Sequence, residues 1–81
     1  MPDSDEPLPL IATAESTDLD GVGYDHALEI LDVKFRKSGK TRRYFNVGGL
    51  IYQGLMLAQS KGVYFNKFIK KNYTSREIGR A

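Results

Sequence analysis

The fold is decided by residues 28–47, which read LEILDVKFRKSGKTRRYFNV. Apolar and polar side chains alternate in the first half of this stretch, as they do along a strand with one buried face. A short loop follows, and its Gly39 can adopt the positive φ that a tight turn requires. The chain then returns as a second strand over residues 41–47, with Arg43 and Phe45 on the same face. The stretch therefore predicts an antiparallel β-hairpin.

Two short helices are predicted after the hairpin. The first runs from about Leu50 to Gln59, and Leu50 and Leu57 widen its buried stripe. Residues 60–62 (SKG) are predicted to end it, and the second helix covers residues 63–72. The fold class is α+β, a small antiparallel meander of two to three strands followed by two short helices packed on one face. The predicted core comprises Leu31, Val33, Phe35, Phe45, Ile51, Leu55, Ala58, Phe65, Phe68 and Ile69.

The two ends of the chain differ from its middle in composition. Residues 1–15 contain all three prolines and four acidic residues, and we predict a disordered acidic arm there. Leu8, Leu10 and Ile11 leave open the alternative that part of this arm docks on the domain. The domain itself is predicted to span residues 16–73, and residues 74–81 are predicted to form a flexible basic tail.

The charges of the 81 residues are segregated along the sequence. Residues 1–33 carry nine Asp and Glu side chains and no Lys or Arg, whereas residues 34–81 carry twelve Lys and Arg side chains and a single acid, Glu77. The formal net charge of +2 therefore conceals a strongly basic C-terminal part. Such asymmetry concerns partners rather than fold, and it predicts contact with a polyanion or with an acidic protein surface.

Several classes of function are disfavoured by the composition. Because there is no cysteine, the chain has no disulfide, no thiolate metal site and no thiol nucleophile. The only histidine, His26, stands beside Asp25 in a predicted loop, and we expect a solvated side chain rather than a general base. Residues 38–41 (SGKT) lack the earlier glycine and the following helix of a phosphate-binding loop. We expect no enzyme activity, no cofactor and no metal, and a cytoplasmic monomer without membrane contact.

Several short motifs are shared with a known family. They are residues 22–25 (VGYD), 31–35 (LDVKF), 43–47 (RYFNV) and, most specific, 60–66 (SKGVYFN). On these motifs residues 16–73 resemble the KTSC domain, a module named for its occurrence at the C-terminus of some lysyl-tRNA synthetases and also found as a stand-alone protein. Arg42 replaces the first tyrosine of the family's Tyr-x-Tyr motif, and Gly48 stands where the family has proline. The resemblance implies the fold, and RNA binding is the activity usually suggested for the family.

Basic and aromatic side chains together predict a nucleic-acid-binding surface. Phosphates need cations along one face, and bases need exposed rings on which to stack. The candidate residues are Arg36, Lys37, Lys40, Arg42, Arg43, Tyr44, Lys61, Tyr64, Lys67, Lys70 and Lys71. Tyr44 is the expected stacking group, and the acids of residues 1–15 are expected to compete for the same surface. The alternative is a protein-interaction module that docks on and regulates a larger nucleic-acid machine, such as RNA polymerase.

Overall fold

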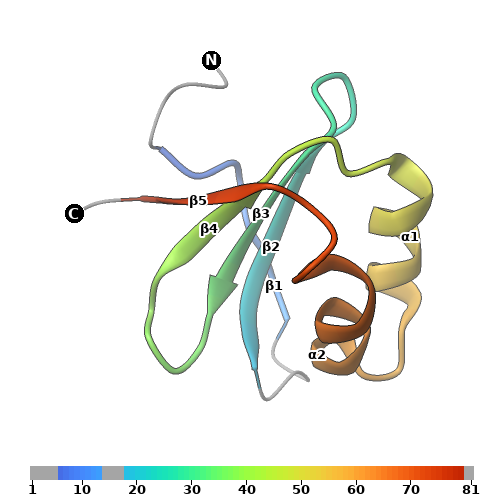
Figure 1. Cartoon of the computed structure of the whole chain (residues 1–81). Coiled ribbons are helices and arrows are strands. Elements are labelled where there is room, and N and C mark those ends of the chain that lie inside the picture. Colours follow the sequence, from blue (N-terminus) through green and yellow to red (C-terminus); the bar gives the residue numbers. More distant parts are fainter. Residues whose placement is uncertain (1–5, 14–17, 80–81) are drawn as a thin grey trace.

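A five-stranded antiparallel sheet forms the centre of the molecule (Figure 1). The computed structural model describes residues 6–13 and 18–79. The strands follow one another across the sheet in chain order: β1 (Ile11–Ala12), β2 (Leu19–Asp25), β3 (Ile30–Phe35), β4 (Thr41–Tyr44) and β5 (Ser75–Ile78). The prediction of two to three strands is wrong, because β1 and β5 lie in the segments assigned to the arm and the tail.

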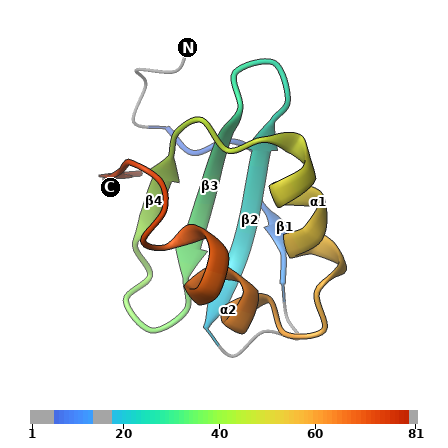
Figure 2. The same ribbon diagram turned by 45° about the vertical axis from the view of Figure 1, so that its right-hand side comes forward.

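Three consecutive helical segments link β4 to β5 and cover one face of the sheet (Figures 1 and 2). They are α1 (Gly49–Leu57), α2 (Lys61–Tyr64) and the π-helix η1 (Phe65–Ile69). Among the described residues, no helix is long and apolar enough to cross a membrane. The predicted α+β class is confirmed, with a larger sheet than expected.

The main core lies between the sheet and the helices. Its buried members are Leu19, Val22, Leu31, Val33, Tyr44, Val47, Leu55, Phe65 and Ile69. Half of the predicted core is therefore buried as expected, and Phe35, Phe45, Ile51 and Ala58 are half-buried. The assignment of Phe68 to the core is wrong, since its side chain is 42% exposed. Leu50 and Leu57 do not belong to the buried stripe either, because their side chains are 82% and 78% exposed.

The two faces of β4 are opposite to those predicted. Tyr44 lies beside Leu31 in the sheet register and directs its ring into the core, 5.4 Å from the Phe65 ring centroid. Arg43 therefore points to the other face, where it opposes Asp32. A Tyr-Phe pair offers an apolar residue to either face of a strand, so alternation alone leaves the register undecided.

The second face of the sheet is covered by residues 6–13, which we call the strap. The Leu8 N–H donates a hydrogen bond of 2.9 Å to Asp32 Oδ2, and the Arg43 guanidinium donates one of 3.1 Å to the Glu6 carbonyl. The strap then pairs with β2 through β1, and Thr13 Oγ1 donates to the Leu19 carbonyl at 2.6 Å. Over these residues the structure differs from the predicted disordered arm and agrees with the docked alternative. Residues 1–5 and 14–15 lie outside the described residues.

Two glycines of β2 allow the strap to lie close to the sheet. A Cβ atom on Gly23 would lie 2.7 Å from the Pro9 carbonyl oxygen and 3.1 Å from Leu8 Cβ. A Cβ atom on Gly21 would lie 3.3 Å from Leu10 Cβ. A glycine inside a strand often marks such a close approach of a second backbone. Leu8 and Leu10 are thereby half-buried against the sheet, whereas Ile11 is 55% exposed.

Residues 60–62, which the sequence predicts to end the first helix, instead begin the second one. The first helix stops at Leu57, and the Ser60 hydroxyl accepts a hydrogen bond from the Val63 N–H at 3.3 Å, as an N-cap does. Gly62 lies inside α2, so its predicted role as a helix stop is wrong. The predicted turn glycine of the hairpin, Gly39, does have a positive φ of 71°.

Candidate nucleic-acid interface

Three of the eleven candidate binding residues are buried and present no surface to a ligand. Arg43 and Tyr44 are each 2% exposed, and Lys61 is 8% exposed. Sequence reasoning places all three on an accessible surface, because charged and phenolic side chains usually remain in water. Each of them instead lies in the interior, at or beside the sheet and α2.

Arg43 has a structural partner that explains its burial. Its Nε donates to Asp32 Oδ1 at 2.8 Å and its Nη2 donates to Asp32 Oδ2 at 3.0 Å, which is a bidentate ion pair. Asp32 is fully buried, and the strap supplies the Leu8 N–H as a further donor to its carboxylate. The pair therefore holds the strap, β3 and β4 together beneath the surface.

Tyr44, the expected stacking group, and its neighbour Arg42 are both engaged within the protein. Burial raises the pKa of Tyr44 above its usual value near 10, which is consistent with a ring enclosed by the core. The Arg42 side chain donates to Ser75 Oγ from Nε at 3.2 Å and from Nη2 at 3.1 Å. It thus connects β4 to β5, and neither residue is available for base stacking.

Arg36 is also engaged within the protein. Its Nη1 lies 3.1 Å from Asp20 Oδ1, and its Nη2 donates to the carbonyls of Thr13 and Leu19 at 3.2 Å. Tyr64 is half-buried with its ring 4.7 Å from that of Phe68. Both residues therefore have roles in packing that sequence reasoning does not assign to them.

The candidate cations that remain exposed, besides Arg36, are lysines of the hairpin loop, of η1 and of the two residues that follow η1. They are Lys37, Lys40, Lys67, Lys70 and Lys71. Lys67 Nζ lies 5.5 Å from the centroid of the Phe68 ring, a cation–π contact on the outside of η1. The candidate binding residues predicted from the sequence include lysines of the hairpin and of the second predicted helix, and one lysine from each lines a common hollow.

A hollow of about 270 Å³ lies between the hairpin loop and η1. We call it the basic hollow. Lys37 and Ser38 line it from the loop, and on the other side it is lined by Asn66 of η1 and by Lys70, the C-cap of η1. The remaining lining residues are Asp18, Leu19, Phe35 and Phe65. Two ammonium groups, one carboxylate, two small polar side chains and two aromatic rings therefore surround one concave site.

Local structure explains how these side chains come together. β3 ends at Phe35, so that Lys37 and Ser38 lie in the turn immediately after a half-buried ring. On the other side, the Lys70 N–H donates to the Phe65 carbonyl at 2.9 Å, the five-residue spacing of a π-helix. The Phe35 and Phe65 rings meet edge to face with centroids 5.4 Å apart. Packing of these two rings joins the hairpin to η1.

Sequence reasoning misses four polar or aromatic members of the hollow. It assigns Phe35 wholly to the core, and it does not single out Asp18, Ser38 or Asn66. Asn66 could have been found, because it closes the specific motif of residues 60–66. Within the described part of the chain, no group of three or more potential metal ligands is present.

The arrangement of strands and helices is shared with known proteins. A family model described as the KTSC domain matches residues 15–73. The chain belongs to the KTSC domain family. The crystal structure of a KTSC domain protein from Yersinia pestis is similar, with 32% sequence identity and a TM-score of 0.83, and the match covers 90% of this chain and 100% of that one. A search of curated proteins finds no match.

The structural match extends beyond the family model. Residues 15–73 make up less of the chain than the 90% covered by the Yersinia pestis protein. The KTSC fold in these two proteins therefore includes residues that flank the segment recognised by the family model.

Proposed function

We propose that this KTSC domain is a non-enzymatic binding domain for single-stranded nucleic acid, with RNA as the preferred form. The observation that carries the proposal is the basic hollow, where Lys37 and Lys70 meet beside the half-buried Phe35 ring. These two lysines are 33 positions apart in the sequence, and the fold brings them to one concave site. A site of this kind combines the cations and the ring that single-strand recognition requires.

The chemistry of the hollow fits one nucleotide unit. The ammonium groups of Lys37 and Lys70 neutralise a phosphate, and the Phe35 ring offers an edge or face to a base. The Ser38 hydroxyl and the Asn66 amide can donate and accept hydrogen bonds at the base or at a 2′-hydroxyl. Asp18 accepts hydrogen bonds and repels phosphate, so it favours the base or sugar on its side of the hollow.

The size of the hollow argues for an unstacked base rather than a duplex. Its volume of about 270 Å³ lies just below the range of roughly 300–1,000 Å³ that holds drug-sized ligands. Bases of single-stranded RNA can be splayed into such a site, whereas the bases of a duplex remain stacked and paired. We therefore expect short single strands to bind more tightly than a duplex of equal charge.

The test is a fluorescence-anisotropy titration of a labelled short single-stranded RNA at several salt concentrations. Replacing Lys37 or Lys70 with Ala should weaken binding and reduce the slope of log K against log salt by about 0.7 for each phosphate that the variant no longer neutralises. Lys71→Ala is the matched control, since it removes the same charge from the residue next to Lys70 but outside the hollow. Equal effects of Lys70→Ala and Lys71→Ala would contradict a localised site.

The contribution of the ring is tested separately. Phe35→Leu should cost on the order of 1–3 kcal/mol of binding free energy, without changing the salt slope. A thermal melt of the variant provides the control, because Phe35 also contacts Phe65. If no nucleic acid binds but the two lysines are needed to capture a protein from nuclease-treated lysate, the protein-interaction alternative replaces this proposal.

A further inference from the structure

The outward face of α1 is apolar, although nothing in the described chain covers it. Leu50 and Leu57 are 82% and 78% exposed. Together with Tyr52, Gln53 and Met56 they line a surface hollow of about 680 Å³, which Gly49 and His26 complete. A helix that is apolar on all sides is normally enclosed by other protein.

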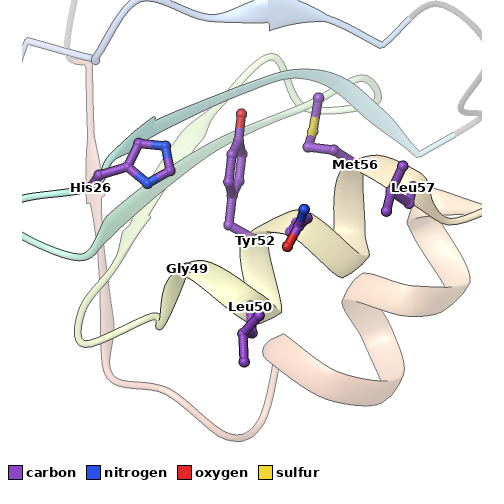
Figure 3. A pocket seen from close by; sticks show the side chains of 7 residues that line it. His26, Gly49, Leu50, Tyr52, Met56 and Leu57 are labelled. Carbon is purple, nitrogen blue, oxygen red and sulfur yellow. The ribbon is translucent and has the colours of Figure 1, made fainter.

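Side-chain packing fixes one flank of this face. The Tyr52 ring stacks on the Tyr24 ring with centroids 4.3 Å apart. The centroid of the His26 ring lies 5.8 Å from that of Tyr52, and Figure 3 shows these two side chains at the hollow. The Tyr24 hydroxyl in turn donates to the Val47 carbonyl at 2.6 Å. Because this flank is held by stacking, the face is preformed and a partner does not have to order it.

The charge of the face restricts its partner. Residues 44–60 contain no Asp, Glu, Lys, Arg or His, in a chain where 27% of all residues are charged. α1 itself therefore contributes no charged side chain that would attract a nucleic acid or a charged protein surface. It also contributes none that would repel the α1 helix of a second copy.

The spacing of the two exposed leucines is self-complementary. Leu50 and Leu57 lie seven residues apart, two helical turns, so they occupy the same stripe of α1. Their midpoint lies between Gln53 and Gly54. When two copies of α1 pack antiparallel about a two-fold axis at this midpoint, Leu50 of one copy faces Leu57 of the other at both ends. An isologous interface requires this reciprocity.

We propose that two copies of this chain associate through antiparallel packing of α1, with Leu50 and Leu57 in reciprocal contact and Gln53 near the two-fold axis. The sequence predicts a monomer and assigns both leucines to the buried stripe of the first helix, whereas the structure exposes both of them. A nine-residue helix is only about 13 Å long. Such a contact is smaller than the roughly 800 Å² per partner of a standard interface, so the dimer is weak and concentration-dependent.

The test uses a pair of charged variants, Leu50→Lys and Leu57→Glu, studied by sedimentation velocity over a concentration series. The parent chain is expected to shift from monomer to dimer as its concentration rises. Each variant alone should raise the dimer dissociation constant by about tenfold or more, because a charge then faces a leucine at both ends. An equimolar mixture should regain association, since the introduced lysine and glutamate then face each other while the native leucines pair at the other end.

The controls separate this geometry from other outcomes. Val63→Glu changes a side chain that is 64% exposed and lines neither hollow, so it should leave the dimer unchanged. Circular dichroism should match the parent for every variant, because the substituted side chains lie at the surface. A chain that stays monomeric at all concentrations, a dimer insensitive to both α1 variants, or a mixture that fails to associate would each overturn the proposal.

Discussion

Replacing Arg43 with Met tests whether this arginine is a buried structural cation. Both partners of the ion pair are enclosed, Arg43 at 2% and Asp32 at 0% exposure. The substitution removes the two charge-assisted hydrogen bonds of 2.8 and 3.0 Å and leaves the Asp32 carboxylate with the Leu8 N–H. Breaking a buried pair from one side typically costs about 3–5 kcal/mol, because the remaining charge has no compensation.

A loss of this size is a large part of the total stability of a small domain, roughly 5–15 kcal/mol. The assay is urea unfolding followed by far-ultraviolet circular dichroism, with the slope against urea showing whether the transition stays two-state. Arg42→Met is the matched control, since this neighbouring arginine is half-buried and bonded to the Ser75 hydroxyl. Arg42→Met should lower the free energy of unfolding by about 0.5–1.5 kcal/mol.

A double variant makes the test sharper. Arg43→Met combined with Asp32→Leu removes both buried charges, and it should recover most of the stability that Arg43→Met alone removes. The reasoning is refuted if the free energy of unfolding of Arg43→Met lies within about 1 kcal/mol of that of the parent, because a loss of this size is typical of exposed ion pairs. If that stable variant also binds RNA more weakly, Arg43 is a ligand contact, as the sequence predicts.

Three further predictions follow from the core, the strap and the tyrosines. Leu55→Ala should lose about 2–5 kcal/mol in urea unfolding, because Leu55 is fully buried, and a parent-like midpoint would contradict its place in the core. Gly23→Ala should displace the strap and speed hydrogen exchange of the Leu8 amide, whereas unchanged protection would show that the strap tolerates a Cβ atom. Burial raises the pKa of Tyr24, with smaller contributions from nearby acids, and burial also raises that of Tyr44, so the folded state favours the neutral phenols. The contribution of the two phenols to the free energy of unfolding should be complete below the unfolded-state pKa of about 10, and it should decline as the pH rises above that value. Urea unfolding midpoints that stay constant through that pH range would refute this prediction.

The parts of the fold that were predictable are local in sequence. The hairpin of β3 and β4 is specified by short-range alternation and by Gly39 with its positive φ of 71°. β1 and β5 are short, and each is fixed by pairing with a neighbouring strand, β1 with β2 and β5 with β4, rather than by a local pattern of its own. A two-residue strand such as β1 carries no periodicity, and residues 6–13 become ordered only through contacts with a sheet formed later in the chain.

In the candidate site, too, only the features that depend on residues close in sequence were predictable. Lysines of the hairpin loop and of the second predicted helix, residues 63–72, are exposed, which is the usual outcome for Lys in a turn and on a helix. Burial of Arg43 was not predictable from its own neighbours, because it depends on Asp32 in another strand and on the strap. Phe35 has the composition of a core residue and occupies the edge of the core, where a ring is both packed and partly exposed.

The strap has a consequence for where this domain begins. The family model starts at residue 15, but the Leu8 N–H and the Glu6 carbonyl both bind the buried ion pair from outside that boundary. From the sequence alone, removal of residues 1–15 should tighten nucleic-acid binding by removing acidic competitors. The same cut would admit water to Asp32 and Arg43 and leave the edge of β2 unpaired. The segment that the family model matches is therefore shorter than the segment that packs around the buried ion pair. A fusion that places this domain in another protein has to include residues 6–13.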